Sequence, residues 1–192
     1  GVPVKPDMDD LVDTNDARKI VDICLERGAN LSYVLSDEHK AEDGFDVHQI
    51  RGSYYSLLNA DDDAYIAARA IQFFVPGIPQ VYYVTLLAGE NDEANIAKTG
   101  DGREINRHNF TVEEIEESLE KPVVKRLLKL IKFRNEYEAF NGEFKVIDTA
   151  PDQVHLSWEK DEKFCTLLID LTTNKTVIKY KDDDGQLVEY NV

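Results

Sequence analysis

Apolar residues follow a helical spacing through the middle of the chain. From residue 64 to residue 74 they recur at the interval that places them on one helix face, and three aspartates directly before this stretch suit a helix N-terminus. Residues 76–79 read Pro-Gly-Ile-Pro, which ends the helix because proline cannot supply a backbone donor. The β-branched and aromatic run that follows predicts a strand over 80–84, buried on both faces. A helix packed on such a strand is typical of an α/β fold.

A polar stretch with several glycines follows the predicted strand. It covers residues 86–108, which is long for a connection inside a compact domain. Loops at the carboxyl ends of the strands carry the active sites of (β/α)8 barrels. We therefore expect this stretch to be an irregular loop near a functional site, and we expect His108 at its end to be a structural hydrogen-bonding residue.

Other patterns flank this region. Helical spacing predicts a helix ended by Gly28, a short helix over 111–119, and a longer helix over 123–140 that packs on the predicted strand. Residues 29–44 are polar and predict an exposed irregular segment. After Gly142 apolar and polar residues alternate, which predicts a small antiparallel β domain. Its expected strands are 144–147, 154–158, 164–171, 176–180 and 187–190.

The charge of the chain limits its partners. With 38 acidic and 22 basic side chains, the 192 residues carry a formal net charge of −16. Nucleic acids and anionic membranes would repel such a chain, so neither is expected as a partner. The two cysteines lie far apart in sequence and within apolar surroundings, which favours free thiols in the reducing cytoplasm over a disulfide. Neither a signal peptide nor a zinc-binding spacing of cysteine and histidine is evident.

Several long strings then carry a family resemblance. In chain order they read SYYSLLNADDDAYIAARAIQFFVPGIPQVYYV, LLAGEND, GREINRH and PVVKRLLKLIKFRNE. Together they resemble the C-terminal part of the sucrose phosphorylases, which are α-amylase-superfamily enzymes that transfer glucose between sucrose and phosphate. The resemblance implies an α/β fold with the C-terminal part of a TIM (β/α)8 barrel. Residues 1–44 would be an excursion domain after the seventh strand, 45–141 the end of the barrel, and 142–192 a C-terminal β domain.

The resemblance also implies where the catalytic groups lie. Retaining glycosyl transfer needs two carboxyl groups about 5 to 5.5 Å apart, one as nucleophile and one as acid and base. The motifs that surround the family's nucleophile, its acid/base glutamate and its stabilising aspartate do not occur in this sequence. We expect all three upstream of Gly1, so that these 192 residues supply no catalytic residue and are inactive alone.

Five residues match substrate-binding positions of the family. Asp46, Val47, His48 and Gln49 match the mobile loop of the acceptor site, and Arg103 matches the arginine that closes the glucose pocket by pairing with an aspartate. Alternatively, Asp46 and Gln49 are solvated residues at a strand start, and Arg103 is a surface arginine. The histidine at position 48 resembles the residue of relatives that prefer sucrose 6-phosphate. A physical reason for this preference is that an imidazolium can donate to a phosphate. A neutral histidine stacked on sugar or loop is an equal alternative.

The sequence thus predicts part of a cytoplasmic, retaining sucrose phosphorylase that makes α-D-glucose 1-phosphate and fructose from sucrose and inorganic phosphate. One alternative is a sucrose 6-phosphate phosphorylase or another acceptor specificity of the same family. A second alternative is a carbohydrate-binding module without catalysis, in which Trp158 and several tyrosines contact sugar, although an aromatic core explains these residues as well. No metal or organic cofactor is implied, and a homodimer is left open.

Overall fold

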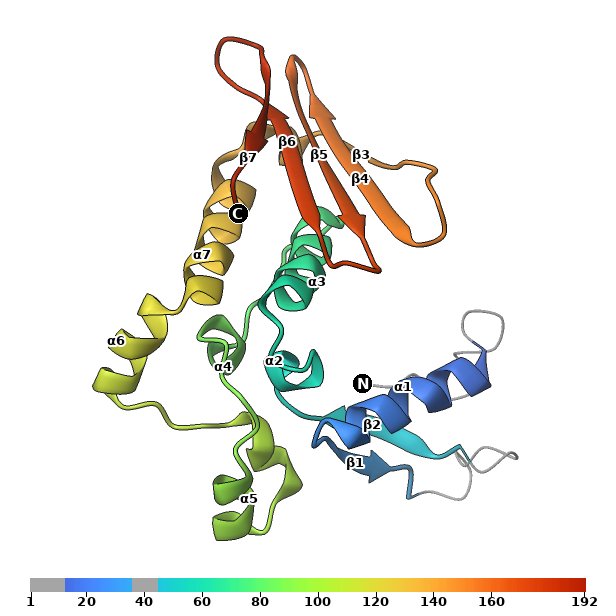
Figure 1. Ribbon diagram of the computed structural model, residues 1–192, viewed down its shortest axis with the longest axis vertical. Coiled ribbons are helices and arrows are strands. Elements are labelled where there is room, and N and C mark those ends of the chain that lie inside the picture. The colour runs from blue at the N-terminus through green and yellow to red at the C-terminus, as the bar shows by residue number, and fades with distance from the viewer. Residues whose placement is uncertain (1–12, 36–44) are drawn as a thin grey trace. The chain divides into compact units, whose positions relative to one another are not determined.

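The structure is a computed structural model that describes residues 13–35 and 45–192 (Figure 1). The chain forms two compact units. The hairpin unit comprises Gly1–Ala60 and Ala88–Thr111, and the sheet unit comprises Asp61–Leu87 and Val112–Val192. Each unit is built from two separate stretches of the chain. The described residues form helices and two antiparallel sheets.

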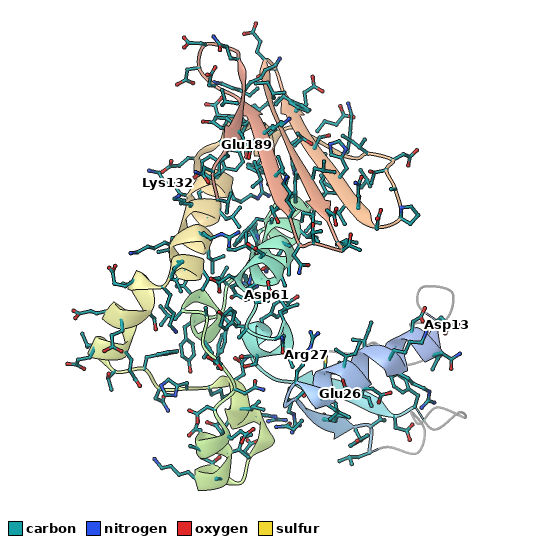
Figure 2. The ribbon with its side chains drawn as sticks, in the orientation of Figure 1. Asp13, Glu26, Arg27, Asp61, Lys132 and Glu189 are labelled. Carbon is teal, nitrogen blue, oxygen red and sulfur yellow. The ribbon has the colours of Figure 1, made fainter. Side chains whose placement is uncertain are left out.

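The hairpin unit begins with the helix that the sequence predicts before Gly28. The carboxylate of Asp13 accepts hydrogen bonds from the first backbone N–H groups of α1 (Thr14–Glu26), and Figure 2 shows Asp13 at one end of this helix and Glu26 at the other. Gly28 follows in the left-handed conformation (φ +81°), which a side chain would strain. The remaining elements are β1 (Asn30–Tyr33), β2 (Val47–Arg51), α2 (Tyr54–Leu57), α5 (Glu93–Thr99) and η2 (Gly102–Asn106).

Strand β1 corrects the prediction of an irregular segment over 29–44. Its four residues, Asn-Leu-Ser-Tyr, alternate between polar and apolar, but the pattern is too short to predict a strand without the antiparallel pairing with β2. The pairing runs from Asn30 opposite Arg51 to Tyr33 opposite Val47. Pairing between distant segments is a tertiary effect that overrides local propensity. The part of the prediction that concerns 36–44 lies outside the described residues.

The stretch over 86–108 is also more regular than predicted. Asp92 caps α5 by accepting from Asn95 N at 2.8 Å, and Gly100 ends this helix with φ +72°. Asp101 then caps η2 through the same kind of side-chain contact. Each cap satisfies a backbone group that would otherwise need water, which explains why a polar stretch with few apolar residues still forms helical turns.

The sheet unit begins with α3 (Asp62–Phe74), which confirms the predicted helix. Asp61 caps it by accepting from Ala64 N at 2.7 Å, and Figure 2 shows Asp61 at this end of α3. The predicted strand over 80–84 is wrong. Its last residues instead open the short helix α4 (Tyr83–Leu86). A strand requires a neighbour for its backbone hydrogen bonds, and neither described sheet includes these residues.

Helices α6 (Val112–Glu120) and α7 (Pro122–Glu136) confirm the two helices predicted after residue 110. Helix α7 is shorter than predicted, because Tyr137 has an extended backbone and the chain continues as η3 (Glu138–Asn141). Its buried face packs against α3, where the rings of Phe133 and Phe74 lie 6.4 Å apart. The predicted contact of this helix with a strand over 80–84 therefore does not form.

The five predicted strands after Gly142 are confirmed. They form one antiparallel sheet in chain order, β3 (Glu143–Val146), β4 (Gln153–Lys160), β5 (Lys163–Asp170), β6 (Thr176–Lys181) and β7 (Leu187–Tyr190). Helix α3 covers β4, β5 and β6, and the indole of Trp158 donates a hydrogen bond to Phe74 O at the end of that helix. Among the described residues, no helix has the length and apolar character that crossing a membrane requires.

Candidate functional site

The first four candidate residues lie on one strand of the β1–β2 hairpin. Val47 is buried, Asp46 and Gln49 are half-buried, and His48 is exposed. Val34 N donates to Asp46 O at 2.8 Å, which extends the pairing of the hairpin beyond β2. The backbone of Asp46 is therefore held in the hairpin.

His48 occupies a bulge in this hairpin. The register passes from Ser32 opposite Gln49 directly to Tyr33 opposite Val47, so His48 is the extra residue on β2. A bulge changes the direction of its side chains and is common beside functional sites. Val47 and Ile50 are three residues apart, so the alternation of apolar and polar residues shifts at His48 and Gln49, which is the signal that a bulge leaves in a sequence. The bulge offers a physical reason why the imidazole is exposed while Val47 is buried and Gln49 is half-buried.

Arg103 lies on η2, and its side chain is exposed. Its backbone N donates to Asp101 Oδ1 at 2.8 Å, so the turn itself is held by a cap. The preceding residue, Gly102, lies against the end of the hairpin. Asn30 Nδ2 donates to Gly102 O at 2.9 Å, and a Cβ at Gly102 would lie 3.0 Å from Arg51 Nη1. The structure thus brings the segment of Arg103 to the hairpin across 72 residues of sequence.

A second set of contacts closes the Arg103 segment on itself. His108 Nδ1 lies 2.7 Å from Asp92 Oδ2, which confirms the predicted hydrogen bonding of His108. This hydrogen bond, together with one from the backbone of Asn95, lowers the pKa of the Asp92 carboxyl from its ordinary value. The amide of Asn95 also donates to Glu104 Oε2 at 3.1 Å. These bonds join the start of the segment to its end and hold η2 in place.

Aromatic and acidic residues outside the hairpin unit are weaker candidates for a binding site. Trp158 is 6% exposed, and its indole N–H is bonded within the core, so it is not available to contact a sugar. The aromatic-core explanation of this residue is the one that the structure supports. Within residues 13–35 and 45–192, no three histidine, cysteine or carboxylate side chains lie close enough together to hold a metal ion.

Comparison with known proteins shows which enzymes the chain is similar to. No protein-family model matches the chain. Over all 192 residues the chain is 64% identical to the sucrose 6(F)-phosphate phosphorylase of Thermoanaerobacterium thermosaccharolyticum, of which it covers 39%. The chain is a homologue of the sucrose phosphorylases. It is also 43% identical over 172 residues to the glucosylglycerol phosphorylase of Marinobacter adhaerens, covering 90% of this chain and 34% of that protein. Against the sucrose phosphorylase of Bifidobacterium adolescentis the identity is 42% over 153 residues, covering 76% of this chain and 30% of that protein.

A solved sucrose phosphorylase homologue has the same fold. The crystal structure of sucrose 6F-phosphate phosphorylase from Thermoanaerobacter thermosaccharolyticum matches with a TM-score of 0.96 at 64% identity, covering 100% of this chain and 39% of that one. The chain therefore spans about two fifths of the length of these relatives. These findings confirm the resemblance to sucrose phosphorylases. The relatives are named for different glucosides, so similarity to them does not by itself select a substrate.

Proposed function

We propose that the chain is part of a retaining phosphorylase that transfers glucose from a sucrose-type donor to inorganic phosphate. The products are α-D-glucose 1-phosphate and either fructose or fructose 6-phosphate. The observation that carries this proposal is the 64% identity over the whole chain to a sucrose 6(F)-phosphate phosphorylase. The exposed imidazole of His48, raised on a bulge, favours sucrose 6-phosphate as donor, and sucrose is the second candidate.

The proposal assigns the chain to the C-terminal part of a (β/α)8 barrel enzyme. Residues 1–44 form the excursion domain after the seventh strand, 45–141 the end of the barrel, and 142–192 the β domain. The support is the length of the relatives, since this chain covers 39% of a homologous phosphorylase. The nucleophile, the acid/base carboxyl and the stabilising carboxylate lie elsewhere in the longer protein, so these 192 residues alone do not turn over. We also propose a cytoplasmic location and leave a homodimer open.

The five candidate residues then have distinct roles. Asp46 accepts hydrogen bonds from sugar hydroxyls, and the Gln49 amide both donates and accepts. Val47 is buried, so it stabilises the strand that carries them. The guanidinium of Arg103 holds a carboxylate of the glucose pocket in a bidentate pair. Protonated His48 donates to the phosphate of the fructosyl group, which a neutral hydroxyl cannot match in charge.

The donor preference can be tested with the complete enzyme and its His48→Tyr variant. A charge-assisted hydrogen bond contributes about 1.5–3 kcal/mol, which corresponds to roughly a 10- to 100-fold change in kcat/KM. We expect His48→Tyr to lower kcat/KM for sucrose 6-phosphate by this factor and to leave kcat/KM for sucrose nearly unchanged. Sucrose turnover in the same preparation is the internal control. Equal losses on both donors would overturn the proposed role of His48, and no phosphorolysis of either donor by the unmodified enzyme would overturn the proposed function.

A further inference from the structure

The side chain of Asn91 joins segments that are far apart in the sequence. Its Oδ1 accepts a hydrogen bond from Ser53 N at 2.7 Å, and its Nδ2 donates to Gly28 O at 3.1 Å. The backbone N of Asn91 also donates to Ser56 Oγ at 2.9 Å. One amide therefore uses its donor and its acceptor on two different parts of the hairpin unit.

Both of these parts belong to the same end of the β1–β2 hairpin. Gly28 lies two residues before Asn30, the first residue of β1, and Ser53 lies two residues after Arg51, the last residue of β2. Asn30 and Arg51 are paired across the hairpin. Ser53 is fully buried, at 0% exposed, so its backbone N–H has no access to water and depends on the Asn91 acceptor. The Asn91 amide thus links the entry of the hairpin to its exit.

The chain passes from Asn91 directly into the segment that carries Arg103. Asp92 N donates to Ile105 O at 2.8 Å, which ties the start of this segment to η2. At the same end of the hairpin, Asn30 Nδ2 donates to Gly102 O. Contacts of two asparagine side chains therefore fix the α5–η2 segment relative to the β1–β2 hairpin, one before α5 and one at the first residue of η2.

We propose that Asn91 is a positioning residue that sets the place of Arg103 relative to the strand of Asp46, His48 and Gln49. This inference rests on the proposed function, because it assumes that both sets of residues contact one substrate. Asn91 is needed as an asparagine, since a carboxylate at this position could accept from Ser53 N but could not donate to the Gly28 carbonyl. Misplacing a binding group by about 1 Å can lower the rate by roughly 100-fold.

The test uses the complete enzyme with Asn91→Asp, Arg103→Lys and the double variant. Asn91→Asp should lower kcat/KM for phosphorolysis by roughly 10- to 100-fold. If Asn91 acts through Arg103, the two substitutions will not be independent, and Arg103→Lys will cost less than about threefold once Asn91→Asp is present. A merely structural role would lower the amount of active enzyme, which reduces kcat without changing KM and leaves the two effects multiplicative.

A matched control and a second variant complete the test. Asn109→Asp makes the same chemical change at an exposed position of the same unit, and kcat/KM should stay within about twofold of the unmodified enzyme. Asn30→Asp removes the amide that donates to Gly102 O, which is the second contact between the hairpin and η2. It should show the same non-additivity with Arg103→Lys even if Asn91→Asp folds poorly. Full activity of Asn91→Asp, or multiplicative effects with Arg103→Lys for both asparagine variants, would overturn the inference. A lack of phosphorolysis in the unmodified enzyme overturns the proposed function instead and is seen before any variants are compared.

Discussion

Substitution of Gly142 by alanine should detach β3 from the sheet. Gly142 follows η3 and precedes β3, and a Cβ there would lie 2.0 Å from Glu159 O and 2.6 Å from Lys160 Cβ. Ordinary van der Waals contact begins at 3.4 Å, so the added methyl group requires a shift of 3.4 − 2.0 = 1.4 Å. The obstacle is the backbone of β4, which cannot move aside as the end of a flexible side chain can. The strand that gives way is therefore β3, the edge strand.

The magnitude follows from the pairing that is lost. Strand β3 meets β4 at four register positions, from Glu143 opposite Glu159 to Val146 opposite Leu156. A shift of 1.4 Å stretches a hydrogen bond from about 2.9 Å to about 4.3 Å, which is beyond the bonding range. At about 1 kcal/mol net for each bond, the loss of two to four bonds lowers the free energy of unfolding by about 2–4 kcal/mol.

Hydrogen exchange can locate this effect, and a second glycine provides the control. We expect Gly142→Ala to abolish amide protection over residues 143–146 and to lower the urea midpoint. Gly185→Ala places the same methyl group where no heavy atom lies within 4 Å, and its cost is only the left-handed backbone (φ +76°), about 1–2 kcal/mol. Retained protection over 143–146 in Gly142→Ala, with a midpoint above that of Gly185→Ala, would refute the steric argument.

Three further predictions concern the remaining chemistry. Burial raises the pKa of Cys165 to about 12, so at pH 8 a thiol reagent should label the half-buried Cys24 before Cys165, and equal labelling rates would contradict this. The free energy of unfolding should also fall as pH rises from 9 to 12, because the unfolded state loses the Cys165 proton at a lower pH than the folded state. The pKa of Asp92 is lower in the folded state than its ordinary value of 3.8, so the ionised carboxylate stabilises the fold above pH 3.8, and this stabilisation is lost as pH falls through the folded value. The difference in free energy of unfolding between the unmodified protein and Asp92→Asn, measured in urea, should therefore be smaller at pH 3 than at pH 7. Trp158→Phe leaves the buried carbonyl of Phe74 without its donor and should cost about 1–3 kcal/mol in the same assay, whereas an unchanged midpoint would show that this bond contributes nothing.

Helices with local caps were predictable from the sequence. Asp13 and Asp61 each precede an apolar helical pattern, and in both cases the carboxylate accepts from the first backbone N–H groups of the helix. The strands after Gly142 were predictable because each pairs with its neighbour in sequence through a short connection. In both cases the interaction partners lie within a few residues, so local patterns contain the necessary information.

The errors concern elements whose partners lie far away. Strand β1 is only four residues long and exists through its pairing with β2, which follows after residue 44. The run over 80–84 has the composition of a buried strand, but composition does not supply the neighbour that a strand needs. The candidate residues were identified through family resemblance, whereas the contacts of Asn30 and Asn91 have no local signature.

The hairpin unit is made of two separate stretches of chain, and the backbone is left-handed where the chain leaves the unit and where it returns. The chain leaves this unit after Ala60 and returns at Ala88. Among the described non-glycine residues with positive φ are Asn59 (+62°) and Ala60 (+51°) at the exit and Ala88 (+46°) at the return, where Ala88 is also 1% exposed. Left-handed backbone costs about 1–2 kcal/mol for such residues, so it persists only where surrounding contacts enforce it. Three residues after this return, Asn91 makes the contacts that join the hairpin to the Arg103 segment, so the chain re-enters the unit close to the candidate site in sequence.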